Sequence, residues 1–166
     1  MLCPDEPELI ERIALALIQR RERMGTAESC TGGLIAAACT SLAGSSQWFE
    51  RSVVSYSNQA KTEMLGVPPG LLELHGAVSA EVAQSMARGL YAHAPVEWTL
   101  AVTGIAGPSG GSEDKPVGTV WLALYHHGKP IKVWQELFKG DRHAVRAATV
   151  RVGLSALCEA LEDRDS

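Results

Sequence analysis

The sequence has no long apolar run and no segment that resembles a leader. No window reaches the roughly 18 consecutive apolar residues that a membrane helix requires. The first residues, Met1 to Glu6, contain no basic stretch followed by an apolar core, so we expect no signal peptide. The length of 166 residues favours a single domain over residues 1–166, because about 100–200 residues per domain is usual.

Positive charge and aromatic side chains are also scarce. Lys and Arg number 15 against 19 Asp and Glu, which gives a formal net charge of -4 and a pI near 5.7. Only 5% of the residues are aromatic. A nucleic-acid surface needs clustered basic residues. We therefore expect neither a nucleic acid nor a membrane as a partner, although one or two placed cations suffice to hold a single phosphate.

The sequence contains no recognisable metal motif. The five histidines include His126 and His127 but form no H-E-x-x-H. We expect a cytoplasmic protein with reduced thiols, no metal site and no cofactor. The four cysteines contain no C-x-x-C pair and no zinc-ligand spacing; they are Cys3, Cys30, Cys39 and Cys158.

Hydrophobic periodicity predicts alternating helices and strands. This alternation favours an α/β fold, a three-layer α/β/α arrangement whose sheet is mixed and mostly parallel. Residues 24–28 are interpreted as a short link that enters a strand end, and residues 68–70 as a break. The expected strands are 53–56, 98–103, 117–125 and 131–138. The expected helices are 6–23, one that opens at 34–39, one with Asn58 as N-cap that extends to Leu65, one from Ser79, and one from Asp141 to about Ala160.

Three loops rich in hydroxyls or glycine follow predicted strand ends: residues 29–33, 56–61 and 103–111. In open α/β sheets, ligands bind outside the carboxyl ends of the strands. We therefore expect these loops to converge on one site.

The first loop offers a nucleophile. Ser29 precedes Thr31, Gly32 and Gly33 at a helix start, where free backbone N–H groups hold a phosphate or a developing oxyanion. The alternative is that Ser29 or Thr31 only caps the helix and the glycines only form a tight turn. Cys30 is a second candidate nucleophile. The alternative is that Cys30 is only a small buried residue next to the turn.

The second loop offers a base for that serine. Lys61 falls in the first turn of a helix, where the positive helix end disfavours the ammonium form, and burial lowers its pKa further. Tyr56 relays the proton or donates to the substrate in this interpretation. The alternative is a solvated lysine and a tyrosine that packs at a strand end.

The third loop and the last helix offer a phosphate site. Gly107, Gly110 and Gly111 lie in a glycine-rich loop that is neither G-x-G-x-x-G nor a P-loop, so a flexible connection is an equal alternative. Arg142 opens the last helix with a geometry that suits one phosphate. An exposed arginine near a helix cap is its alternative.

Taken together, these motifs resemble the CinA C-terminal-domain family. They run in family order over nearly the whole chain, from about residue 8 to residue 160. The segments that carry the resemblance are TAESCTGG at 26–33, AGSSQWF at 43–49, SYSNQAK at 55–61, HGAVS at 75–79, TGIAGP at 103–108 and GGSEDKPVGTV at 110–120.

The resemblance implies amide hydrolysis. Members of this family are nicotinamide-nucleotide amidohydrolases, which convert nicotinamide mononucleotide to nicotinate mononucleotide and ammonia. Others carry an extra N-terminal domain, and this chain resembles the stand-alone form. By the resemblance, Ser29 is the nucleophile, Lys61 the general base and Tyr56 the tyrosine between them. Thr103, the 107–111 loop and Arg142 match positions around the nucleotide.

Two departures and two alternatives accompany the resemblance. Residues 22–26 are more polar than the apolar strand expected before the nucleophile, and Arg51-Ser52 stands where many relatives carry glycines in a loop beside the site. A nucleotide-binding or protein-interaction module without turnover uses the same loops, and an amidase for another carboxamide has the same motifs. We expect a homodimer, since two-fold pairs are the commonest oligomers.

Overall fold

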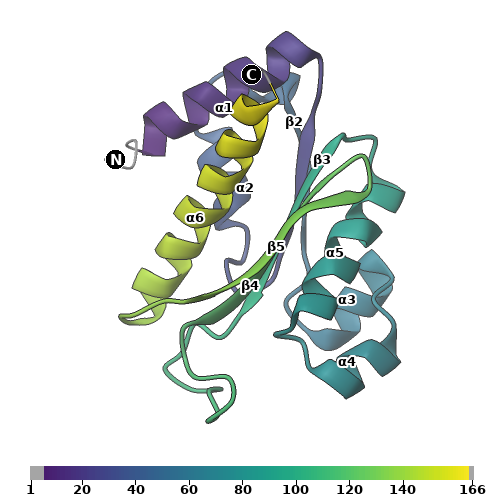
Figure 1. The fold of residues 1–166 in the computed structure, drawn as a ribbon, viewed down its shortest axis with the longest axis vertical. Helices are drawn as coiled ribbons and strands as arrows, with labels where there is room; N and C mark the ends of the chain where they lie inside the picture. The colour runs from purple at the N-terminus through teal and green to yellow at the C-terminus, as the bar shows by residue number, and fades with distance from the viewer. Residues whose placement is uncertain (1–5, 165–166) are drawn as a thin grey trace.

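A five-stranded sheet forms the centre of the molecule in this computed structural model, which describes residues 6–164 (Figure 1). The strand order is β2-β1-β3-β4-β5. β1 pairs in parallel with β2 and β3, whereas β4 is antiparallel to both β3 and β5, so β4 alone of these five strands runs in the reverse direction. The strands are β1 (Met24–Glu28), β2 (Phe49–Val54), β3 (Trp98–Gly104), β4 (Thr119–His126) and β5 (Lys129–Leu137).

Helices cover both faces of this sheet (Figure 1). On one face lie α1 (Glu6–Arg20), α2 (Leu34–Thr40) and α6 (Arg142–Asp163); on the other lie α3 (Asn58–Leu65), α4 (Pro69–His75) and α5 (Ala80–His93). A short 3₁₀ turn spans Ser45–Gln47. The predicted three-layer α/β/α fold with a mixed sheet is confirmed.

Two hydrophobic clusters, one on each face, hold the layers together. The predicted apolar stripe of α1 is buried: Ile13 and Leu17 are fully inaccessible. On the other face, Met86 and Leu90 of α5 are likewise fully buried. Burial of one such side chain contributes roughly 1.5–3 kcal/mol. The sheet is therefore fixed from both sides, and its strand ends are rigid supports for loops.

Several predicted boundaries were wrong. Residues 24–28 are not a link but the fully buried strand β1, which pairs on both edges. β2 begins at Phe49 and ends at Val54, so Tyr56 follows the strand, and Arg51-Ser52 lies within the strand rather than in a loop. The expected break at 68–70 contains the start of α4, because proline is tolerated in the first turn of a helix. The N-cap of α3 is Ser57 and not Asn58.

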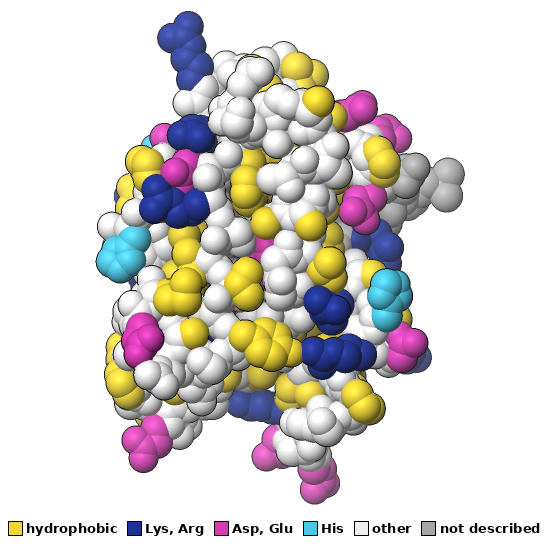
Figure 2. Space-filling model, turned by 180° about the vertical axis from the view of Figure 1, so that it is seen from behind, with side chains coloured by type: hydrophobic (Ala, Val, Ile, Leu, Met, Phe, Trp, Pro, Cys, Tyr) yellow, Lys and Arg dark blue, Asp and Glu magenta, His cyan; other side chains and the backbone are white. Residues whose placement is uncertain are grey.

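Charged side chains are dispersed over one face of the molecule. On the face shown in Figure 2, Lys and Arg side chains stand in small separate groups among acidic and apolar side chains. Among the residues that the structure describes, no helix combines the length and the apolar character that a membrane crossing needs.

Candidate functional site

The three predicted loops meet at the carboxyl ends of β1, β2 and β3. There they line a cavity of about 240 Å³. Ser29 follows β1, Tyr56 follows β2, and Thr103 lies near the end of β3. Because these strands run in parallel, their ends fall on one edge of the sheet, and loops that are distant in sequence come together there.

Lys61 and Ser29 form a buried hydrogen-bonded pair. The Lys61 Nζ donates to the Ser29 Oγ at 3.0 Å and to the carbonyl oxygen of Ser55 at 2.8 Å. The Lys61 side chain is only 1% exposed, and burial lowers its pKa from 10.5. Neither acceptor carries a charge, so no carboxylate offsets the cost of burying an ammonium group. The pair therefore combines a hydroxyl with an amine that is biased towards its neutral form.

Local helix geometry places this lysine. The Ser57 Oγ accepts from the N–H of Ala60 and so caps α3. Lys61 then lies in the first turn, where the unpaired N–H groups give the helix end a partial positive charge. That field opposes a second positive charge and acts in the same direction as burial.

Cys30 is a poor competitor for the role of nucleophile. Burial raises the pKa of its thiol to about 12, so the thiolate is scarce at neutral pH. Its side chain is 4% exposed, although the residue lines the cavity beside Ser29. The serine that contacts the lysine is the better-placed group.

A buried carboxylate, which sequence reasoning missed, shapes the turn after Ser29. Glu28 is fully buried, and its Oε2 accepts from the Thr31 hydroxyl at 2.6 Å and the Gly33 N–H at 3.0 Å. Its two oxygens also accept from the N–H groups of Ile35 and Ala36 in the first turn of α2. Glu28 thus caps α2 and anchors the turn of residues 29–33.

This network changes the predicted oxyanion donors. The Gly33 N–H is taken by Glu28, and the Gly32 N–H donates to the carbonyl oxygen of Ser29. Thr31, Gly32 and Gly33 do not line the cavity. Within residues 6–164, the backbone N–H groups of Cys30 and Thr31 have no hydrogen-bond partner. The backbone N–H group that is available beside Ser29 in the cavity is therefore that of Cys30 rather than that of Gly32 or Gly33.

A second residue that sequence reasoning missed, Arg146, holds the same turn from α6. Its Nε donates to the carbonyl oxygen of Cys30 at 3.1 Å and its Nη2 to that of Thr31 at 3.2 Å. Arg146 follows Arg142 by four residues, and such a spacing places both on one face of a helix. That periodicity is the signal by which it could have been found.

Tyr56 and Arg142 lie together at the mouth of the cavity. The Arg142 Nη2 donates to the Tyr56 hydroxyl at 2.6 Å, and its Nη1 donates to the carbonyl oxygen of Gly107 at 2.9 Å. Tyr56 is 58% exposed. Among the described residues its hydroxyl makes no hydrogen bond to Ser29 or Lys61, so the structure does not bring Tyr56 between them.

The predicted nucleotide positions are brought together only in part. Thr103 is buried at the cavity and donates to the carbonyl oxygen of Ala77 at 2.9 Å. Gly107 and Gly110 line the cavity with positive φ angles of 83° and 92°. Gly111 does not line it: a Cβ there would lie 2.8 Å from the N atom of Val117, which indicates a packing role.

A second cavity of about 510 Å³ adjoins the first and shares Ala106 and Arg142 with it. His143 and Arg146 supply further basic groups there, at the start of the long helix α6. Among the described residues, the one cluster of three metal-ligating side chains lies elsewhere, at Glu22, His126 and His127. The site geometry therefore offers a serine, a lysine, backbone donors and an arginine.

Comparison with known proteins gives consistent matches over most of the chain. The family model described as the CinA C-terminal domain matches residues 6–161. A nicotinamide-nucleotide amidohydrolase PncC from Shigella flexneri is 47% identical over 150 residues, 90% of this chain and 91% of that protein. A CinA-like protein from Geobacter sp. strain M21 is 50% identical over 157 residues, which are 95% of this chain but 38% of that protein.

Solved structures share the fold. A competence-damaged protein (CinA) superfamily protein from Klebsiella pneumoniae has a TM-score of 0.92 and 39% identity, with 96% of this chain and 99% of that chain covered. The competence/damage inducible protein CihA from Agrobacterium tumefaciens has a TM-score of 0.88 and 43% identity, with 98% and 99% covered. The likeness therefore extends over at least 96% of this chain in both comparisons.

Proposed function

The chain belongs to the CinA C-terminal domain family, and we propose that it is an amidohydrolase that deamidates nicotinamide mononucleotide through Ser29 and Lys61. Relatives that match along nearly their whole length bear the name nicotinamide-nucleotide amidohydrolase, which supports the reaction class and the substrate. The observation that carries the mechanism is the 3.0 Å hydrogen bond between the Lys61 Nζ and the Ser29 Oγ.

The first half of the proposed reaction forms an ester with the enzyme. Neutral Lys61 takes the proton of the Ser29 hydroxyl while the Oγ attacks the carboxamide carbon. The tetrahedral oxyanion accepts a hydrogen bond from the N–H group of Cys30, which lines the cavity, and one such donor contributes roughly 3 kcal/mol in a dry site. The C–N bond then breaks, protonated Lys61 returns the proton to the leaving nitrogen, and ammonia departs.

The second half releases the acid. Lys61, neutral again, takes a proton from a water molecule that attacks the acyl carbon. The ester bond breaks, the proton returns to the Ser29 Oγ, and nicotinate mononucleotide leaves. Apart from the substrate, the two half-reactions need only side chains of this protein and one water molecule. Tyr56 and Arg142, which are hydrogen-bonded to each other, are proposed to contact the substrate at the mouth of the cavity rather than to relay this proton.

The nucleotide phosphate is proposed to bind near Arg142. A guanidinium donates two parallel hydrogen bonds to a phosphate, and the glycine loop at 107–110 brings backbone close to the same place. Thr103 and the N-terminus of α6 border this region. The proposal also includes a reducing, cytoplasmic compartment, since Cys30, Cys39 and Cys158 are buried free thiols, and a homodimer. Cys3 lies outside the described residues.

Ammonia release from nicotinamide mononucleotide by the purified chain tests the function. We expect turnover by the wild type and at least a thousandfold loss in Ser29→Ala, since removal of a nucleophile abolishes its covalent step. Ser46→Ala, at an exposed serine of the Ser45–Gln47 turn that does not line this cavity, is the matched control and should keep activity.

The same assay separates the alternatives. Tight binding of the nucleotide without turnover by the wild type would point to a non-catalytic module. Ammonia release from other carboxamides but not from the mononucleotide would point to a different amidase. Full activity in Ser29→Ala would refute the serine mechanism.

A further inference from the structure

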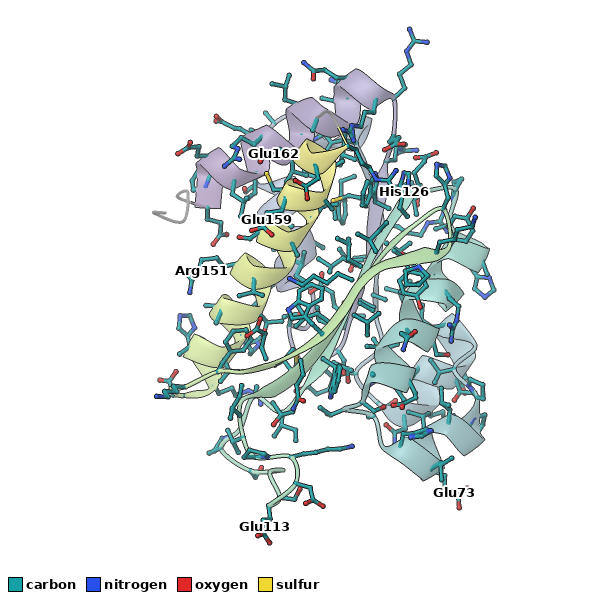
Figure 3. The ribbon with its side chains drawn as sticks, viewed as in Figure 1. Glu73, Glu113, His126, Arg151, Glu159 and Glu162 are labelled. Atoms are coloured by element: carbon teal, nitrogen blue, oxygen red, sulfur yellow. The ribbon has the colours of Figure 1, made fainter. Side chains whose placement is uncertain are left out.

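Three metal-ligating side chains meet at the end of the sheet opposite the proposed active site. Glu22 precedes β1, whereas His126 ends β4 and His127 follows it. Their ligand atoms all lie within 4.8 Å of one another. Figure 3 shows His126 at one end of the sheet and Glu113, in the loop beside the proposed active site, at the other. The cluster is therefore separate from the machinery proposed for amide hydrolysis.

The distances in the cluster are close to those of a coordination sphere. The His126 Nε2 lies 3.1 Å from the Glu22 Oε1, and the His127 Nε2 lies 4.0 Å from the same oxygen. Zinc binds imidazole nitrogen and carboxylate oxygen at about 2.0–2.2 Å, so tetrahedral ligands stand roughly 3.3 Å apart. Only the His127 ring has to move closer to the other two side chains to reach this spacing. The side chain of His127 is 56% exposed, and its ring already stands edge-on against the His126 ring, with centroids 4.3 Å apart.

The other two ligands are held by a second layer of contacts. The Glu22 Oε2 accepts from the Trp98 Nε1 at 2.7 Å, which leaves the Oε1 directed at the histidines. The His126 ring lies against the Trp98 ring, with centroids 4.2 Å apart. Such outer contacts fix ligand orientation in known metal sites and raise affinity. The backbone of His127 is fixed as well, because its N–H donates to the carbonyl oxygen of Glu97 at 2.8 Å.

We propose that Glu22, His126 and His127 form a binding site for one divalent transition-metal ion of the zinc type. Two imidazoles and a carboxylate suit zinc, cobalt, nickel and copper rather than magnesium or calcium. The exposed side of His127 leaves a fourth position for water. A bound ion would tie the N-terminal end of β1 to the hairpin between β4 and β5, so its main effect would be on stability. Arg164, stacked on Trp98, adds positive charge nearby and limits affinity.

The cluster could not be found from sequence spacing. Glu22 and His126 are separated by 104 positions, and no motif connects them. The sequence predicted no metal site because its histidines form no known ligand pattern. The fold supplies the third ligand: the link before β1 brings the Glu22 side chain beside the end of β4.

Calorimetric titration of the full chain with zinc chloride tests the site. We expect one zinc ion per chain for the wild type, and at least tenfold weaker binding for Glu22→Gln and for His127→Asn. Asparagine tolerates the positive φ of 48° at residue 127, and glutamine can still accept from Trp98, so both variants should fold. His93→Asn, at a histidine on α5 outside the cluster, is the matched control and should bind like the wild type.

Two further readouts make the outcome decisive. Zinc should raise the melting temperature of the wild type and of His93→Asn but not that of the two cluster variants. Cobalt should give the visible spectrum of a tetrahedral nitrogen and oxygen site without a thiolate charge-transfer band. No zinc binding by the wild type, equal binding by Glu22→Gln and His127→Asn, or a thiolate band would overturn the proposal.

Discussion

At the scale of single residues, the proposed chemistry depends on a lysine that is buried without a charged partner. Lys61 contacts a hydroxyl and a carbonyl oxygen, and burial lowers its pKa from 10.5. The protonated form is the one that the surroundings disfavour. In the unfolded chain this penalty is absent, so the unfolded state binds the proton more readily than the folded state does.

The lowered pKa predicts the pH profile of the reaction. Only neutral Lys61 accepts the Ser29 proton, so kcat/KM should rise with pH and level off once the pH exceeds the folded pKa, below 10.5. Lys61→Arg should be inactive at every pH, because a guanidinium stays protonated. Initial rates of ammonia release across neutral and alkaline pH measure this. A flat profile, or a limb that falls with rising pH from neutrality, would contradict the base role.

The same shift predicts a stability effect. Because the folded pKa of Lys61 is below its unfolded value, its contribution to the free energy of unfolding should rise with pH from the folded pKa up to about 10.5. Lys61→Met should remove this part of the pH dependence. Urea unfolding at a series of pH values measures the slopes, and identical slopes in the two proteins would count against a shifted lysine.

Glu28 carries a third prediction at this scale. Its carboxylate accepts from Thr31 and from backbone N–H groups of the α2 turn, so an amide NH₂ at this place would face donors. Glu28→Gln should lower the free energy of unfolding by about 1–3 kcal/mol, the cost of leaving buried groups unpaired. Glu73→Gln, on the surface of α4, is the control (Figure 3). Equal urea midpoints for the two variants would contradict this role.

At the scale of elements, the turn of residues 29–33, which contains the proposed nucleophile, is held between two helices. Glu28 fixes it to the start of α2, and Arg146 reaches it from α6 with donors to two successive carbonyl oxygens. The carbonyls of Cys30 and Thr31 therefore point towards α6. Their orientation fixes the backbone of this turn, which also carries the Cys30 N–H group proposed to hold the oxyanion.

Arg146→Lys should therefore impair chemistry more than binding. A lysine keeps the charge but cannot donate to both carbonyl oxygens in a fixed plane. We expect kcat to fall about tenfold to a hundredfold with little change in KM, since small misplacements of reacting groups have effects of this size. Arg151→Lys, on the exposed side of the same helix, is the control (Figure 3). An equal fall in kcat in both variants, or a change in KM without a fall in kcat, would argue against a positioning role for Arg146.

Elements with local signals were predicted from the sequence, and those that depend on distant partners were not. The caps Ser79 and Asp141 accept from N–H groups three residues ahead, so local pattern suffices to find them. Residues 24–28 were interpreted as a link that enters a strand end rather than as the whole strand β1, because Thr26 and Glu28 are polar yet buried, which hides the apolar pattern of a strand. Thr26 donates to Glu28, and their other hydrogen-bond partners lie outside residues 24–28, in the 31–33 turn, in α2 and at Ser52 on β2.

The site shows the same division. Ser29 and Lys61 were singled out because each sits at a helix start with an identifiable chemical role, and the fold brings them into contact. The helical spacing from Arg142 points to Arg146, but its contact with Cys30 lies 116 positions away in sequence. Glu22 and His126 are 104 positions apart, so only the folded structure reveals these two contacts. Tyr56 shows the converse: the resemblance gives it a place between Ser29 and Lys61, while the structure hydrogen-bonds it to Arg142.

At the scale of the whole molecule, the protein has a net charge of -4, yet basic side chains line the two adjoining cavities. Arg142 belongs to both cavities, and its two donors now engage Tyr56 and Gly107, which a phosphate oxygen could replace. One localised cation suits one phosphate, and on the face shown in Figure 2 the Lys and Arg side chains form no continuous track of the kind that a polyanion needs. Arg142 should therefore contribute almost all of the binding of the substrate phosphate.

Comparison of two substrates isolates that contact. Arg142→Ala should raise the KM for nicotinamide mononucleotide about tenfold or more, because a hydrogen bond to a charged group contributes about 1.5–3 kcal/mol. The dephosphorylated riboside should bind the wild type and the variant equally, since it lacks the group that Arg142 recognises. Added salt should weaken binding of the mononucleotide to the wild type and leave the variant nearly unaffected. A KM increase of the same size for both substrates would mean that Arg142 acts by supporting Tyr56 and the 107–110 loop instead of by holding the phosphate.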